Sequence, residues 1–146
     1  MAGRRWQPES FPTDMASLDT NCILRWFLDD VPAQRQRLDA LMTARQALVV
    51  DDAAVIEAVC ALEHGAKLKR QTIRGFLDAL AAQPVEMNRS LWSGALDIWV
   101  ERPKLSVVDV YLTVKAGLAG EQPLYTFDAK LAHQLEGAQV VPGASS

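Results

Sequence analysis

The chain has 146 residues, 49% of them apolar and 23% charged, which suits one soluble globular domain with a substantial core. A formal net charge of −3 argues against a general nucleic-acid coat protein, because non-specific affinity comes from many Lys and Arg contacts to phosphate. We expect neither a membrane span nor a secretory signal, since no apolar run approaches the roughly 18 residues of a transmembrane helix and none follows Arg4 and Arg5.

The first half of the chain alternates short apolar runs with helical patterns. Residues 1–14 contain Pro8 and Pro12 and lack periodicity, so we expect a flexible extension there, with Met15 as an alternative natural start. Strands are expected at residues 16–18 and 47–50. Apolar residues at helical spacing predict helices through Cys22–Phe27, Pro32–Met42, Val55–Leu62 and Ile73–Leu80.

The second half continues this alternation. Strands are expected at residues 85–87, 124–125 and 139–141, and helices at residues 91–100, 107–119 and 129–135. Strands that alternate with helices indicate an α/β fold with a parallel sheet covered by helices on both faces. We place this single domain at residues 15–142 and a short tail at residues 143–146.

The two cysteines, Cys22 and Cys60, indicate a cytoplasmic location. Each falls in an apolar helical pattern, which is typical of buried thiols and not of a disulfide framework. Neither has the Cys–His or CxxC spacing of a zinc site. The chemistry of the chain is therefore expected to rest on other side chains.

Four acidic residues fall where such a sheet would bring them to one edge. The carboxyl ends of parallel strands share an edge, and open α/β sheets bind ligands there. Asp19 follows the first expected strand and Asp128 the fourth, while Asp109 lies in the first turn of the helix that starts at Ser106. Glu57 lies a turn or more into the helix after the second strand, from which it can lean back over that edge.

Each acid alone has an ordinary structural explanation, because three of them suit helix starts and Glu57 suits an exposed helix face. Together they are harder to explain. Two unit charges about 5 Å apart cost on the order of 3 kcal/mol at an effective dielectric near 20. Oxygen ligands without Cys or His select hard cations such as Mg²⁺ or Mn²⁺, which can activate water. The reaction class that this chemistry predicts is metal-assisted phosphodiester hydrolysis.

Periodicity does not identify the second acid. On a helical wheel, Glu63 lies nearer than Glu57 to the apolar stripe formed by Val55, Val59 and Leu62. Glu57 instead shares its side of the helix with small residues, which suit the border of a cleft. Both glutamates therefore remain candidates on the residue pattern alone.

The acids lie in motifs that resemble the PIN-domain family, in particular its VapC-like toxin ribonucleases. The first-acid motif is similar to Leu18–Asn21 (LDTN), and the helix that carries the second acid is similar to Glu57–Glu63 (EAVCALE), which favours Glu57. The third-acid helix start resembles Ser106–Asp109 (SVVD). The closing motif, the most specific of the four, resembles Leu124–Leu131 (LYTFDAKL). The motifs follow one another in the order of that family.

This resemblance implies a fold, a reaction and partners. The fold would be a three-layer α/β/α sandwich around a parallel sheet of about five strands. The four acids would bind Mg²⁺ or Mn²⁺, with Asn21 and Thr126 supporting them through hydrogen bonds. The chain would be an endoribonuclease, the toxin of a toxin–antitoxin system, silenced by a small antitoxin protein and paired as a homodimer.

Basic and aromatic residues give weaker signals. We expect Arg25, Lys69 and Arg70 to contact RNA phosphates, because the predicted elements place them near the acidic edge. The plainer interpretation of the stretch around Lys69 is a solvated helix start. Trp26, Trp92 and Trp99 fall in apolar helical patterns, which indicates core or interface positions.

Three alternatives compete with the nuclease. A PIN-like scaffold could bind a protein partner or RNA without cutting it. A receiver-like phosphoacceptor domain would need an acidic pair after the first strand and a lysine after the last, and a dehalogenase-type phosphatase would need a second Asp where Asn21 stands. The sequence does not identify the RNA, because that choice depends on surface shape and loop contacts.

Overall fold

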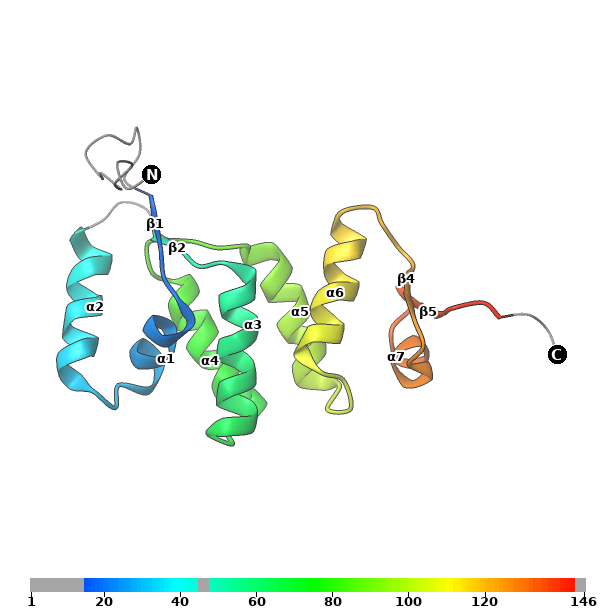
Figure 1. Ribbon diagram of the computed structural model, residues 1–146, viewed down its shortest axis with the longest axis horizontal. Helices are drawn as coiled ribbons and strands as arrows, with labels where there is room; N and C mark the ends of the chain where they lie inside the picture. Colours follow the sequence, from blue (N-terminus) through cyan, green and yellow to red (C-terminus); the bar gives the residue numbers. More distant parts are fainter. Residues whose placement is uncertain (1–14, 45–47, 144–146) are drawn as a thin grey trace, which may run out of the picture. The chain divides into compact units, whose positions relative to one another are not determined.

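The computed structural model describes residues 15–44 and 48–143 (Figure 1). The expected extension at residues 1–14 and residues 144–146 of the expected tail lie outside this part of the chain. The chain divides into two compact units, one comprising Met1–Ala58 with Phe76–Met87 and the other Val59–Gly75 with Asn88–Ser146. Helices α3 (Asp52–Cys60) and α4 (Arg70–Ala81) each run from one unit into the other.

The first unit contains a parallel three-stranded sheet. Its strands lie in the order β1-β2-β3 and comprise Ala16–Ser17, Leu48–Val49 and Val85–Glu86. Ala16 pairs with Leu48, and Leu48 pairs with Val85. Backbone hydrogen bonds continue the pairing beyond the strands, because Leu18 N donates to Val49 O at 3.0 Å and Val50 N to Glu86 O at 2.8 Å. The backbone pairing of the first sheet therefore extends to Leu18, the residue directly before Asp19.

Two helices follow in the first unit, α1 (Thr20–Leu28) and α2 (Pro32–Ala44). Helix α1 buries Ile23, Trp26 and Phe27, and α2 buries Leu38 and Met42. Their apolar residues recur at the three- and four-residue spacing of a helix that packs one face on a core. The Trp26 indole N–H also donates to the Asp39 carboxylate at 3.1 Å, which ties α1 to α2.

The second unit contains a helical pair and a two-stranded sheet. Helices α5 (Arg89–Glu101) and α6 (Val107–Leu118) lie side by side (Figure 1), with the Trp92 ring stacked on Tyr111 at a centroid distance of 5.2 Å. Strands β4 (Leu124–Thr126) and β5 (Ala138–Val140) pair in parallel around α7 (Ala129–Gln134). Trp92 and Trp99 are almost completely buried, as their helical spacing predicts.

The α/β fold expected from the sequence is confirmed. All five expected strands are present and every described pairing is parallel, although the strands lie in a sheet of three and a sheet of two. The helix expected to run through Leu62 changes character at Ala61–Gly65, which form a π-helical turn labelled η2. Within the described ranges, no helix is long and apolar enough to cross a membrane.

Arg70 connects the start of α4 to the α5–α6 segment of the second unit. Its Nε donates to Glu63 Oε2 at 2.7 Å, and its guanidinium nitrogens donate to the carbonyl oxygens of Trp99 and Leu105 at 2.6 and 2.9 Å. The guanidinium carbon lies 4.5 Å from the centre of the Trp99 ring. With a further hydrogen bond to the Arg102 carbonyl at 3.2 Å, one planar cation satisfies a carboxylate and three backbone acceptors, which is the geometry for which arginine is suited.

We expect Arg70→Met to lower the free energy of unfolding by about 3 kcal/mol, because Glu63 and the carbonyl groups would lose their charged donor inside the protein. Methionine keeps the apolar stem, so the loss reports on the guanidinium. The exposed neighbour Lys69 supplies the control, and Lys69→Met should change the free energy by less than about 0.5 kcal/mol. Urea denaturation of both variants tests this, and equal effects would contradict the role given to Arg70.

Candidate functional site

Asp19 is held at the start of α1 by the turn that leaves β1. Its backbone is extended, with φ −85° and ψ 174°, and its Oδ1 accepts a hydrogen bond from Cys22 N at 2.9 Å. This hydrogen bond lowers the pKa of the Asp19 carboxyl below its ordinary value. Asp19 is therefore an exposed, ionised carboxylate with a fixed orientation.

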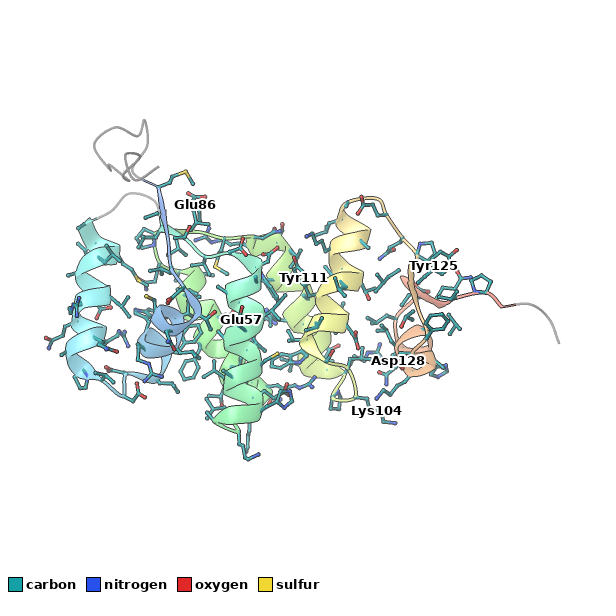
Figure 2. All side chains as sticks on the ribbon, viewed as in Figure 1. Glu57, Glu86, Lys104, Tyr111, Tyr125 and Asp128 are labelled. Atoms are coloured by element: carbon teal, nitrogen blue, oxygen red, sulfur yellow. The ribbon has the colours of Figure 1, made fainter. Side chains whose placement is uncertain are left out.

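Thr20 brings Asp19 and Glu57 into one neighbourhood within the first unit. The Thr20 hydroxyl donates to Glu57 Oε2 at 3.3 Å, across 37 positions of sequence. Glu57 is exposed on α3 (Figure 2). Sequence reasoning singled out both acids but missed Thr20, whose only signal was a hydroxyl directly after the first acid.

The structure distinguishes Glu57 from Glu63, which helical periodicity could not do. Glu63 forms the ion pair with Arg70, and its other oxygen lies 3.4 Å from His64 Nε2. Its side chain is only 17% exposed. Glu63 is therefore engaged inside the protein, whereas Glu57 presents an exposed carboxylate whose described partner is a neutral hydroxyl.

Asp109 lies in the first turn of α6, but it does not cap that helix. Ser106 is the capping residue, since its Oγ accepts a hydrogen bond from Asp109 N at 3.1 Å. The Asp109 carbonyl oxygen accepts from the Thr113 hydroxyl at 2.8 Å. These bonds fix the backbone of Asp109 and leave its half-buried carboxylate outside the capping arrangement.

Asp128 caps α7, and Thr126 supports it. Asp128 Oδ1 accepts hydrogen bonds from Lys130 N at 2.9 Å and Leu131 N at 3.2 Å. Its own N–H donates to Thr126 Oγ1 at 2.9 Å, which holds the turn between β4 and α7. Figure 2 shows Asp128 at the start of α7. Both capping bonds use Oδ1, so Oδ2 is left for another ligand.

Arginines pair with other acids of the chain. Acids of the described residues that form salt bridges with arginine include Asp29, Asp30, Asp39, Glu63 and Asp97. None of the four candidate acids forms such a pair there. Exposed or half-buried carboxylates without a basic partner suit a hard divalent cation, which takes oxygen ligands. The donor chemistry therefore fits Mg²⁺ or Mn²⁺.

The four acids are distributed equally over the two units. Asp19 and Glu57 belong to the first and are linked through Thr20, and Asp109 and Asp128 belong to the second. Over its described residues, neither unit by itself gathers three or more His, Cys, Asp or Glu side chains that could hold an ion.

The other expected site residues have varied surroundings. Asn21 is exposed, and its backbone N–H contributes, less than that of Cys22, to the lowered pKa of Asp19. Arg25 pairs with Asp30 at 2.8 Å. Lys69 is exposed, and Arg70 is committed to the network around Trp99. Arg70 is thus engaged in internal contacts, and contact of Arg25, Lys69 and Arg70 with RNA phosphates stays a prediction.

A comparison with known families matches most of the chain. The model of the PIN domain matches residues 16–134, a segment that contains all four candidate acids as well as Asn21 and Thr126. No curated protein matches the chain.

We expect Asp19→Ala to destabilise the protein by about 1 kcal/mol, because the N–H of Cys22 loses its capping acceptor. Asp19→Asn is the matched control, since asparagine caps a helix about as well as aspartate. Urea denaturation at neutral pH should therefore show a clear loss for alanine and a small one for asparagine. Equal losses would contradict the capping role.

The pH dependence of this stabilisation follows from the lowered pKa of Asp19. A carboxyl whose pKa is depressed by folding stabilises the protein above its unfolded-state pKa, and the contribution is lost as the pH falls through the folded-state pKa. The difference in unfolding free energy between wild type and Asp19→Asn should therefore be constant near neutral pH. Only below about pH 4 should it shift in favour of Asp19→Asn. A difference that favours the wild type increasingly as the pH falls would contradict this sign.

Proposed function

The chain belongs to the PIN domain family, and from this premise we propose that it is a metal-dependent endoribonuclease, the toxin of a toxin–antitoxin pair. PIN domains are generally nucleases, and their substrates are generally nucleic acids. The proposal adds RNA as the substrate and Mg²⁺ or Mn²⁺ as the ion. It also adds a cytoplasmic location, inhibition by a small antitoxin and a homodimeric state, which rest on the resemblance of the four motifs to VapC-like toxins.

The observation that supports the proposal is the lack of a basic partner at each of the four candidate acids. Arginines neutralise Asp30, Glu63 and Asp97, whereas the four candidate acids have no such partner among the described residues. A phosphodiester is itself anionic, so uncompensated carboxylates would repel it. A divalent cation removes this conflict, because it is attracted to both the carboxylates and the phosphate.

The proposed ligands of the ion are Asp19, Glu57, Asp109 and Asp128. When bound, the ion would lower the pKa of a water molecule and stabilise charge on the phosphate. Asp19 and Asp128 are suited to this role because backbone N–H groups already fix their carboxylates. Rigid ligands lose little freedom when they bind, which favours an ordered site.

Thr20 and Thr126 act as positioning residues in this proposal. Thr20 donates to Oε2 of Glu57, which restricts the rotation of a long side chain and leaves its other oxygen without a described partner. Thr126 accepts from the Asp128 N–H and so fixes the backbone from which that carboxylate projects. Hydrogen bonds of this kind orient metal ligands, and their loss commonly costs 10–100-fold in affinity or activity.

We expect Asp109→Asn to reduce RNA cleavage by more than about 100-fold, since removing a ligand should exceed the loss of a supporting hydrogen bond. Wild type and variant would be induced in bacteria without an antitoxin, and growth and total-RNA integrity compared. Asp97→Asn is the matched control, because Asp97 is an exposed acid of the same unit that pairs with Arg74. It should behave as wild type.

The pattern of growth arrest separates the nuclease from its main alternative. Arrest with discrete RNA fragments in wild type and Asp97→Asn, but not in Asp109→Asn, would support the proposal. Arrest by all three proteins without fragments would indicate toxicity through binding and would contradict it. The fragment ends would also identify the RNA substrate.

A further inference from the structure

A cleft of about 830 Å³ lies within the first unit, between residues of α1, α2 and the turn that joins them. Its lining includes the candidate ligand Asp19 together with Asn21 and Cys22 from the start of α1. The volume falls within the range of roughly 300–1,000 Å³ that is typical of small-ligand sites. The cleft therefore offers space for a group the size of a nucleotide directly beside a proposed catalytic carboxylate.

The walls of the cleft combine apolar surface with amide groups. Val31, Leu38 and Leu41 provide the apolar part, and the side chains of Asn21 and Gln34 can both donate and accept hydrogen bonds. A nucleobase has the same two requirements, since its faces are apolar and its edges carry donors and acceptors. A purely apolar groove would instead suit the face of a partner helix.

The charge of the lining is opposite to that of the whole chain. Arg25 and Arg37 against Asp19 give the lining a formal charge of +1, whereas the chain carries −3. Arg25 forms an ion pair with Asp30. Arg35 does not line the cleft, and it donates hydrogen bonds to the Asp39 carboxylate and the Trp26 carbonyl. Arg37 is exposed and makes no ion pair with any residue of the described ranges. It is the arginine of the cleft that is available to an anion.

We propose that this cleft holds one nucleotide of single-stranded RNA beside the bond to be cut, with Arg37 contacting its phosphate and the apolar wall contacting its base. The inference rests on the proposed function and extends it by naming a binding subsite for the substrate. An arginine guanidinium matches phosphate geometry through paired N–H donors. Contact with the base by a preformed cleft requires an unpaired nucleotide, because the bases of double-stranded RNA are stacked and paired within the helix, whereas those of single strands can be splayed out.

Cys22 provides a direct readout of occupancy, because it lines the cleft whereas Cys60, the only other cysteine, does not. Both thiols are free and half-buried, and burial raises the pKa of each. Labelling by N-ethylmaleimide would be followed at each cysteine by mass spectrometry, with and without RNA. The probe is a fluorescein-labelled, random-sequence RNA single strand of about 12 nucleotides, within the roughly 4–16 nucleotides that an OB fold covers on a single strand. The protein is Asp109→Asn in Mg²⁺, so that the RNA stays intact.

We expect RNA to slow the labelling of Cys22 several-fold and to leave Cys60 unchanged. In parallel, Arg37→Ala should weaken RNA binding and lower the magnitude of the salt slope by about 0.7, the value for one phosphate contact on a single strand. Lys104→Ala is the control, since it removes one exposed positive charge outside the cleft (Figure 2). Its salt slope should match that of the unsubstituted protein.

The outcomes separate this inference from the proposed function. RNA that binds but protects neither cysteine, or an Arg37→Ala slope equal to that of Lys104→Ala, would overturn the subsite even if the wild type cuts RNA in cells. A protein partner that protects Cys22 where RNA does not would assign the cleft to that partner and also overturn it. Failure of the wild type to cut RNA would overturn the proposed function, on which the subsite depends.

Discussion

The balance between carboxylates and cations is the constraint on which the structure and the proposed chemistry depend. Arg70 neutralises Glu63 inside the second unit, and Arg25 and Arg74 each neutralise an acid nearer the surface. Removing one partner from an internal pair leaves an uncompensated charge, so Arg70 and Glu63 belong to the architecture. Among the described residues, the four candidate acids lie outside these pairs, so their charge remains available for a metal ion.

Capping and catalysis are compatible at the same residue. Asp19 and Asp128 both accept backbone N–H groups at helix starts, which is the ordinary structural explanation of an aspartate there. The same hydrogen bonds lower the cost of orienting a carboxylate for an ion. Thr20 extends this principle to Glu57, which has no cap to hold it. The hydrogen bonds that stabilise the fold locally would therefore also orient these carboxylates for an ion.

The features that could be predicted from sequence are those set by local rules. The positions of Asp19 and Asp128 follow from the strand that ends and the helix that begins around each, and the burial of Trp26, Trp92 and Trp99 follows from helical spacing. Long-range partners could not be predicted. Glu63 is distinguished from Glu57 by Arg70, whose other acceptors lie 29 to 35 positions away, and the division of five strands into two sheets depends on tertiary packing.

The proposal that the candidate acids bind a divalent ion is tested most directly by titration of Mn²⁺ into the purified protein. Electron paramagnetic resonance would measure the free ion for wild type, Asp19→Asn, Asp128→Asn and the paired-acid control Asp30→Asn. The account predicts that Asp19→Asn and Asp128→Asn each weaken Mn²⁺ binding by at least about tenfold, whereas Asp30→Asn binds as wild type. Unchanged binding in Asp19→Asn and Asp128→Asn would contradict it.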